Sequence, residues 1–153
     1  MNAVSVYTGD RLADYNFGPD HPFGPARLNA FLARFHESGL ALRCRLVAPR
    51  MAQRADIERF HTGGYIDRVI RLSVTGEGYL DSGDTPAFPG VYEAATWVVG
   101  TVLRAVEDLM GGIAGHAFVP IAGLHHARAD SAAGFCVFND CAIAIESLRR
   151  MYG

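Results

Sequence analysis

The segment from Val91 to Met110 limits the possible folds of this chain more than any other segment does. Apolar residues recur through it at the spacing of one helical face and predict a single long helix. The apolar stripe consists of Val91, Ala95, Val98, Val102, Val106 and Leu109. An apolar run over residues 117–122 follows, and its length suits a buried strand, although Pro120 lacks the N–H that a strand ladder needs. A helix followed by a buried strand points to a layered fold of helices and sheet.

Shorter segments before and after this pair continue the alternation of strands and helices. The expected elements are strands over residues 4–7 and 46–48, a helix from Pro25 to about Gly39, a short helix capped by Asp56, a helix over residues 65–72 and a last helix over residues 140–150. This order predicts an α/β fold with parallel strands. Ligands bind beyond the carboxyl ends of such strands, so the polar loop over residues 123–139 is the expected position of a site.

The composition is that of one globular domain. Half of the 153 residues are hydrophobic, a fifth are charged and the net charge is -2, which argues against a disordered chain and against a nucleic-acid partner. No apolar run approaches the ~20 residues that cross a bilayer, and no export signal is present, so we expect a cytoplasmic protein without a membrane partner. The three cysteines show no C-x-x-C spacing and predict no disulfide framework.

Two adjacent histidines, His125 and His126, lie at the start of the polar loop. Histidine exchanges protons near neutral pH and is a common general acid or base. Side chains at adjacent positions diverge unless the backbone turns, so the two rings are expected to approach a substrate from different angles. A histidine pair by itself is also typical of a polar loop surface, and the residues around the pair decide between the two interpretations.

Four segments resemble the histone deacetylase superfamily in their order and approximate spacing. They are Asn16–Pro22 with Pro25 and Arg27, Phe60–His61 with Tyr65–Ile66, Asp81–Gly90, and His125–Ala127 with Ala133–Cys136 and Asn139–Asp140. The third segment resembles the rim loop of the bacterial acetoin-utilisation branch. The resemblance implies the N-terminal part of an arginase/deacetylase-like parallel sheet flanked by helices, and a single, incomplete domain over residues 1–153.

The resemblance also implies roles in the hydrolysis of an acyl-lysine or another acetylated amine. His126 would be the general acid or base, and His125 would stabilise charge on the tetrahedral intermediate. Gly134 and Phe135 would form the wall of the channel around the acyl-lysine chain, where an aromatic face suits an aliphatic stem.

Two further residues are expected farther from the reacting atoms. Asp84 resembles the rim carboxylate that accepts hydrogen bonds from the substrate backbone, although an aspartate at this position could simply cap a turn. Arg27 resembles an arginine that lines an inner cavity, and a plain surface charge is the alternative.

Zinc is the cofactor that the resemblance implies for a full-length member, because zinc-bound water is a stronger nucleophile than free water. The family's ligands, an aspartate and a histidine on the next strand and a later aspartate, would follow Gly153. His21, His36, His61 and His116 are scattered, and no H-E-x-x-H motif is present. We therefore expect that this chain alone has no metal ligands, does not bind zinc tightly and does not turn over substrate.

Two other functions stay open. In one, the chain is a truncated or split deacetylase without catalysis, a binding or assembly module that pairs with a second copy or with a complementing C-terminal fragment. In the other, Cys136 is the nucleophile of a cysteine hydrolase rather than a small buried residue. His21 and His61 are expected to be structural, and Asn139 and Asp140 are expected to cap the last helix.

Overall fold

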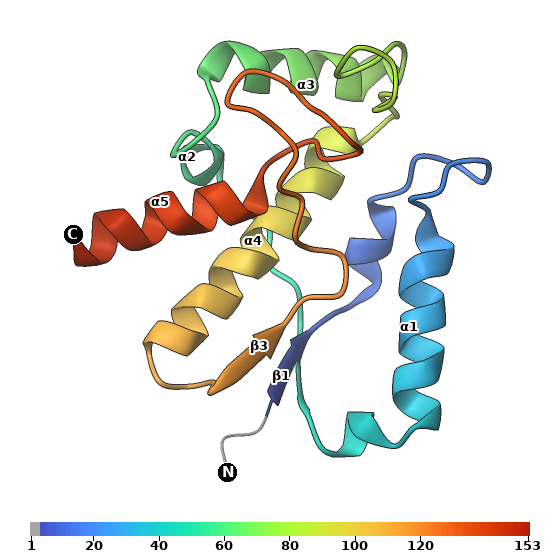
Figure 1. The fold of residues 1–153 in the computed structure, drawn as a ribbon. Helices are drawn as coiled ribbons and strands as arrows, with labels where there is room; N and C mark the ends of the chain where they lie inside the picture. Colours follow the sequence, from blue (N-terminus) through green and yellow to red (C-terminus); the bar gives the residue numbers. More distant parts are fainter. Residues whose placement is uncertain (1–3) are drawn as a thin grey trace.

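A parallel three-stranded sheet lies at the centre of the computed structural model, which describes residues 4–153 (Figure 1). Its strands are β1 (Val4–Tyr7), β2 (Arg45–Val47) and β3 (His116–Phe118), in the order β2-β1-β3. Ser5 of β1 lies opposite both Arg45 and Ala117. Parallel neighbours need crossover connections, and helical segments supply them. The α/β fold predicted from the sequence is confirmed.

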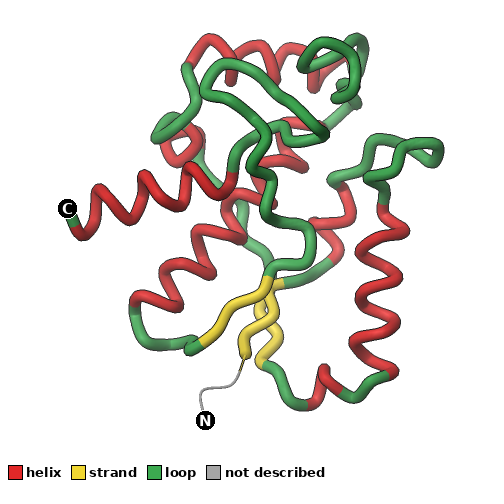
Figure 2. Tube along the Cα trace, in the orientation of Figure 1, coloured by secondary structure: helices red, strands yellow, loops and turns green. Residues whose placement is uncertain are grey.

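Helices flank the sheet, with α1 on one side and α4 on the other (Figure 1). The helices are η1 (Asp10–Asp14), α1 (Pro25–Glu37), η2 (Leu40–Leu42), α2 (Arg54–Ile57), α3 (Gly63–Thr75), α4 (Val91–Met110) and α5 (Asp140–Tyr152). Long loops gather beyond the carboxyl ends of the strands (Figure 2). None of these helices is long and apolar enough to cross a membrane.

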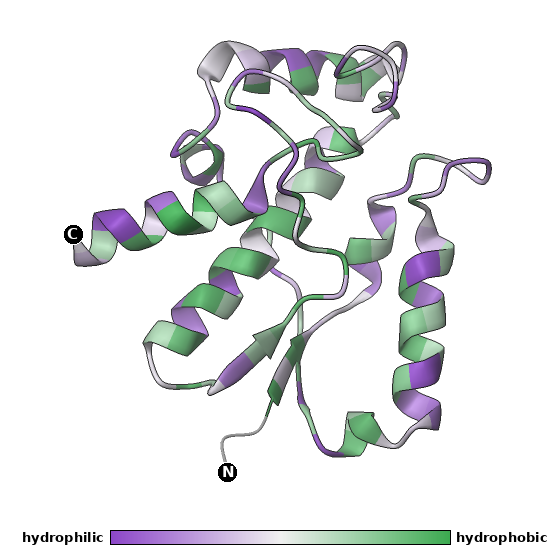
Figure 3. Ribbon diagram, viewed as in Figure 1, coloured by the Kyte–Doolittle hydropathy of each residue, from purple (hydrophilic) through white to green (hydrophobic). Residues whose placement is uncertain are grey.

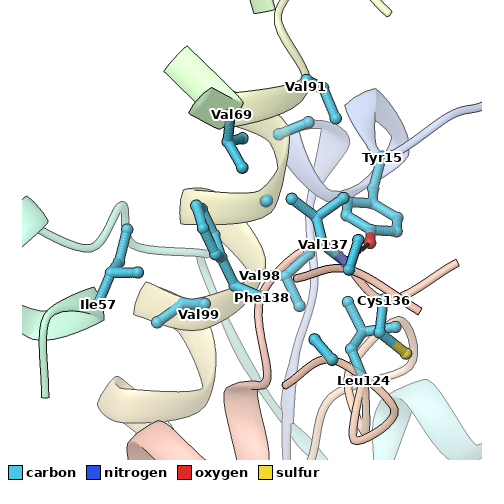
Figure 4. Packing of buried hydrophobic residues seen from close by; sticks show 14 of the residues in the cluster. Tyr15, Ile57, Val69, Val91, Val98, Val99, Leu124, Cys136, Val137 and Phe138 are labelled. Atoms are coloured by element: carbon cyan, nitrogen blue, oxygen red, sulfur yellow. Dashed lines mark hydrogen bonds between the residues drawn. The ribbon is translucent and has the colours of Figure 1, made fainter. Parts of the chain in front are cut away.

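Helix α4 has the bounds predicted from its apolar stripe and forms the centre of the core. Apolar and polar residues alternate along it, as Figure 3 shows. Val91 and Val98 are fully buried and share the core with Val69 and Phe138 (Figure 4). Burying a valine in this way contributes about 1.5–3 kcal/mol. Leu109, near the other end of the helix, is 38% exposed, so the stripe is covered less completely there.

A buried carboxylate joins α4 to two strands of the sheet. Asp108 accepts hydrogen bonds from the Tyr7 hydroxyl at 2.9 Å and from the side chains of Arg45 and Arg104 at 2.6 and 3.0 Å. Burial acts to raise the pKa of Asp108, but these donors hold it below its ordinary value. The network fixes the last turns of α4 against the sheet.

Two helices begin differently from the prediction. Gln53, not Asp56, is the N-cap of α2, because Asp56 is the third helical residue and its carboxylate accepts the Gln53 N–H at 2.9 Å. The next helix, α3, begins at Gly63 rather than near Tyr65, because Thr62 Oγ1 accepts the Tyr65 N–H at 3.4 Å and caps the helix. The first two residues of α3 are Gly63 and Gly64, which carry no apolar side chain, so the apolar spacing could not mark where the helix begins.

The prediction of a buried strand over residues 117–122 is wrong in both length and burial. Strand β3 ends at Phe118, whose side chain is 47% exposed. Among residues 4–153, β3 pairs only with β1, so its other edge is open. Beyond the strand, Pro120 provides no N–H, and the Ala122 N–H turns back to the Val119 carbonyl at 3.3 Å.

Candidate active site

The loop between β3 and α5 places His125 and His126 side by side. Their ring centroids are 4.4 Å apart and their planes differ by 31°, so the rings do not diverge. The backbone turns before them, because Gly123 has a φ of 95° and the His125 N–H donates to the Gly123 carbonyl at 3.0 Å. Both side chains are exposed. Both rings are therefore accessible from solvent.

The Gly123 carbonyl also fixes the tautomer of His125. Its oxygen lies 2.9 Å from His125 Nδ1. A carbonyl oxygen can only accept, so Nδ1 carries the proton of the neutral ring and Nε2 has the free lone pair. His125 is thus oriented with Nε2 as its basic nitrogen.

Asn139, the residue before α5, holds the histidine loop and caps the helix. Its side-chain amide donates to the carbonyls of His125 and Ala127 at 3.0 and 2.9 Å. Its side-chain oxygen accepts the Ala142 N–H at 2.9 Å, which confirms the predicted cap.

Asp140 holds the same loop one residue later, and the expectation that it also caps α5 is wrong. Its carboxylate accepts the N–H groups of Gly123 and Leu124 at 3.0 and 3.2 Å. Burial raises the pKa of Asp140 above its ordinary value, although these N–H groups oppose the rise. The carboxylate therefore anchors the backbone that leads into the histidine pair.

Gly134 and Phe135 form a tight turn next to His126. Ala133 and Cys136 exchange both backbone hydrogen bonds across it, at 2.9 and 3.2 Å, and the two central residues have φ of 53° and 67°. Positive φ at both central positions is the geometry of a type I′ turn. A β-carbon on Gly134 would lie 3.2 Å from His126 Cγ, so the turn and the histidine ring are in contact.

Two hydroxyl groups hold Phe135 in this conformation. The buried Tyr15 hydroxyl donates to the Phe135 carbonyl at 2.6 Å and accepts the Val137 N–H at 3.0 Å. The Phe135 N–H donates to Thr85 Oγ1 at 3.1 Å. The Phe135 ring is half-buried and packs edge-on against His21, with the ring centroids 4.3 Å apart.

Asp81 organises the rim loop, residues 81–85, which carries Asp84. Its Oδ1 accepts the N–H groups of Gly83, Asp84 and Thr85 at 2.9, 3.1 and 2.9 Å, and its Oδ2 accepts the Thr85 hydroxyl at 2.5 Å. Burial acts to raise the pKa of Asp81, but a hydrogen bond with the Asp84 side chain, together with the bonds from Thr85 and Gly83, holds it below its ordinary value. Hydrogen bonding to Asp81 raises the pKa of Asp84. Thr85 thus links the rim loop to the turn at Phe135.

A cleft of about 520 Å³ separates the rim loop from the segment that follows the histidines. Its lining includes Asp81, Asp84, Arg128, Ser131 and Gly134. The structure therefore brings Asp84 and Gly134 of the predicted site together, and Gly134 connects the cleft with His126. Arg27 lies exposed on α1, with its guanidinium carbon 4.8 Å from the centre of the Phe23 ring.

Asp81 and Thr85 lie in the rim segment Asp81–Gly90, but the sequence patterns give neither of them, nor Tyr15, an individual role in this site. The D-x-G pattern that begins at Asp81 is a signal for a turn closed by an aspartate side chain, and it could have marked this residue. Tyr15 carries no such signal, because 120 residues separate it from its partner Phe135.

The ligands of the zinc ion that the family resemblance implies for a full-length member are not found among the described residues. Residues 4–153 contain no group of three or more His, Cys, Asp or Glu side chains that could hold a metal ion. His61 is buried, its Nε2 accepts the Asn139 N–H at 2.9 Å, and its Nδ1 lies 3.3 Å from the Ala129 carbonyl. Burial lowers the pKa of His61 to about 4, so the ring is neutral and structural, as predicted.

Cys136, the candidate nucleophile of a cysteine hydrolase, is only 3% exposed. Burial raises the pKa of its thiol, whereas a catalytic cysteine needs a lowered pKa and access to substrate. Its Sγ lies 3.5 Å from the Gly134 carbonyl. Cys136 is therefore a small buried residue of the turn, and Cys44 and Cys141 are free thiols as well.

The fold and this loop together define an α/β protein with a histidine site beyond the carboxyl ends of a parallel sheet. The chain belongs to the histone deacetylase family, since the model of the histone deacetylase domain matches residues 21–153. The family predicted from four short segments is confirmed.

Nearly the whole chain is similar to three known proteins. It is 34% identical to the acetoin utilization protein AcuC of Bacillus subtilis, over 99% of the chain and 41% of that protein. It is 31% identical to the histone deacetylase clr6 of Schizosaccharomyces pombe, over 97% of the chain and 39% of that protein. The crystal structure of the HDA15 HD domain matches 98% of this chain with a TM-score of 0.88 at 25% identity, and 44% of that structure is covered. The chain thus spans less than half the length of the relatives that it matches.

Proposed function

We propose that this chain supplies the histidine loop and the channel wall of a zinc-dependent deacetylase that hydrolyses the amide of an acyl-lysine or another acetylated amine. One observation supports the proposal most: the two exposed histidine rings lie 4.4 Å apart, and His126 contacts the turn at Gly134. The zinc ligands would come from another part of the polypeptide or from another chain, because residues 4–153 hold no suitable group.

The two histidines would act on charge and protons at the scissile amide. His125 presents Nε2, because the Gly123 carbonyl accepts the Nδ1 proton at 2.9 Å, and once Nε2 is protonated as well its N–H would stabilise negative charge on a tetrahedral intermediate. His126 would deliver a proton to the leaving amine nitrogen. Positioned proton transfer of this kind contributes about 10²–10⁴-fold to a rate.

The turn and the rim loop would hold the substrate. The Phe135 ring offers an apolar face to the aliphatic stem of an acyl-lysine, and hydrogen bonds from Tyr15 and to Thr85 keep its backbone in place. Asp84 is exposed, and its carboxylate would accept N–H groups of the substrate at the rim. Arg27 is exposed on α1, so its role in the wall of an inner cavity, which the family resemblance implies, requires another part of the polypeptide or another chain to cover it.

A chimera tests this proposal. Residues 1–153 are joined to the part of AcuC of Bacillus subtilis that this chain does not match, and the product is expected to hydrolyse a fluorogenic acetyl-lysine reporter in the presence of zinc. His126→Ala is expected to lower turnover by about 10²–10⁴-fold. His36→Ala, at an exposed histidine of α1, is the matched control and should leave turnover unchanged. Full activity of the His126→Ala chimera, or zinc-dependent turnover by the 153-residue chain alone, would contradict the proposal.

The open edge of β3 supports a second candidate function, that of an assembly module without catalysis. A groove of about 290 Å³ lies beside this edge. Its apolar lining includes Val102, Val106, Leu109, Ala117, Val119 and Ala122. A strand of another chain would pair with β3 and cover these residues. We propose a second copy of this chain as that partner, with a complementing C-terminal fragment as the alternative.

A cytoplasmic location is also part of the proposal. Its support is that Cys44, Cys136 and Cys141 are all free, which suits a reducing compartment. Neither a nucleic acid nor a membrane is proposed as a partner.

A further inference from the structure

The cleft beside the rim loop carries charges of both signs. Asp84 reaches it from the rim loop, and Arg128 reaches it from the loop that follows His126. Both side chains are exposed. Within residues 4–153 neither of them takes part in an ion pair, with the other or with a third group. Two opposite charges that share a cleft without pairing can each bind a complementary group of one ligand.

The third charged group of the cleft is not available to a ligand. The Asp81 carboxylate already accepts three backbone N–H groups and the Thr85 hydroxyl, at 2.5 to 3.1 Å. Arg128 differs, because only its backbone N–H is bonded, to the Ser131 carbonyl at 2.9 Å, while its guanidinium donors have no protein partner among the described residues. Asp84 hydrogen-bonds to Asp81, and its Oδ1 lies 3.4 Å from the Thr85 hydroxyl, but its exposed carboxylate still has acceptor capacity for a ligand. This carboxylate and the Arg128 guanidinium therefore remain to select what binds.

We propose that this cleft binds the free α-ammonium and α-carboxylate groups of an acylated amino acid, with the carboxylate on Arg128 and the ammonium on Asp84. A guanidinium pairs with a carboxylate through two parallel hydrogen bonds, which gives both affinity and orientation. The volume of about 520 Å³ lies in the range of small-molecule sites. The assignment names the substrate class of the site and rests on the proposed function for the acyl end of the molecule.

The chemistry of the two charges favours a small molecule over a lysine within a protein. In a polypeptide the α-amino and α-carboxyl groups of an acyl-lysine are neutral amides, which leave a guanidinium without an anion. A free Nε-acyl-lysine carries both charges on one carbon atom. With these charges held in the cleft, its side chain would extend past Gly134 toward His126, since Gly134 lines the cleft and contacts the ring.

Binding to the 153-residue chain tests the assignment without zinc or turnover. The ¹⁵N-labelled chain is titrated with Nε-acetyl-lysine, and the amide signals of Gly83 and Gly134 are followed by NMR. Saturable binding is expected, and Arg128→Gln and Asp84→Asn should each weaken it at least about tenfold. The matched controls, Arg71→Gln on α3 and Asp130→Asn, at an exposed residue between Arg128 and Ser131 that does not line the cleft, should bind as the parent chain does. Arg128→Lys keeps the charge and should recover part of the loss.

A ligand without charges separates the outcomes. Nε-acetyl-lysine with its α-amino group acetylated and its carboxyl group amidated should bind at least about tenfold more weakly, with no further loss in Arg128→Gln. Equal binding of both ligands, no saturable binding of the free amino acid, or tighter binding of a peptide with glutamate next to acetyl-lysine would each overturn the assignment. An inactive chimera would refute the proposed hydrolysis and leave these binding differences intact, so the two failures can be told apart.

Discussion

Phe135 is the only non-glycine residue at positive φ among residues 4–153, and its neighbours explain why it stays there. Such a conformation costs about 1–3 kcal/mol and persists only where the surroundings enforce it. Here the Tyr15 hydroxyl holds the carbonyl at 2.6 Å and Thr85 Oγ1 holds the N–H at 3.1 Å. The same turn contacts His126 through Gly134. The strained turn therefore lies beside the ring of His126, and the hydrogen bonds that hold the turn also fix the shape of the site.

Replacing Thr85 by valine is expected to destabilise this turn. Valine has the shape of threonine but no hydroxyl, so the Phe135 N–H and the Asp81 carboxylate each lose a partner. An unsatisfied buried group costs about 1–3 kcal/mol, and urea denaturation should show a loss of free energy of unfolding in that range. Thr85→Ser keeps the hydroxyl and should lose less than half as much. Equal losses in the two variants would mean that packing, not the hydrogen bonds, is what Thr85 provides.

At the scale of single elements, α4 shows what the apolar periodicity of a sequence can predict about a helix and what it cannot. Its bounds, Val91–Met110, follow from apolar spacing, because one face of this helix packs on the core along much of its length. The apolar spacing does not explain why a glycine, Gly100, stands in the middle of this helix. The structure supplies an explanation: the chain at Arg50 and Ala52 crosses the helix there, and the Ala52 N–H donates to the Thr96 carbonyl at 3.0 Å.

Gly100→Ala is therefore expected to destabilise the protein although alanine is the better helix former. In an open helix this change would stabilise by up to about 1 kcal/mol. Here the new β-carbon would overlap the backbone of Arg50 and Ala52, and the crossing segment would have to move. We expect a loss of about 1–3 kcal/mol in thermal or urea unfolding.

Gly64→Ala is the control for this change, because a β-carbon at Gly64 of α3 meets nothing within 4 Å. It should leave stability unchanged or raise it slightly. If Gly100→Ala also proved stabilising, the close approach of the two segments would not exist in solution.

The candidate site shows the same limit of sequence information. His125, His126, Gly134 and Asp84 could be predicted because they lie in short segments with a recognisable order. The contacts of Tyr15 and Thr85 with Phe135 could not be predicted, because 120 and 50 residues of chain separate these partners. The prediction of a buried strand over residues 117–122 is wrong for a related reason. The same run of apolar residues can form a buried strand or a strand at the open edge of a sheet.

At the scale of the whole molecule, one buried histidine couples the stability of the fold to pH. His61 joins the segment before α3 to the loop at Ala129 and to Asn139. Burial lowers its pKa to about 4 in the folded chain, against about 6.5 for an unfolded histidine. Between these values the unfolded chain binds a proton that the folded chain does not, so stability falls as the pH falls through this window.

The expected loss between pH 7 and pH 4 is on the order of 3 kcal/mol from this residue. His61→Gln, which cannot titrate, should show a flatter dependence of the free energy of unfolding on pH, while His36→Gln should keep the slope of the parent chain. Urea denaturation at pH 7.0, 5.5 and 4.5 measures all three proteins. An unchanged slope in His61→Gln would mean that other groups cause the acid sensitivity.

The open edge of β3 leads to the last prediction, which concerns association of whole chains. Phe118 is 47% exposed at this edge, and Leu109, which lines the same groove, is 38% exposed. Unpaired strand edges with apolar neighbours favour pairing between chains, and a lysine at such an edge opposes it. The mass measured by analytical ultracentrifugation should therefore rise with protein concentration for the parent chain and much less for Phe118→Lys. Val74→Lys, at a side chain 80% exposed on α3, is the matched control and should associate as the parent chain does. Equal loss of association in both variants would place the contact elsewhere, and a parent chain that stays monomeric at every concentration would refute the second candidate function in its self-pairing form.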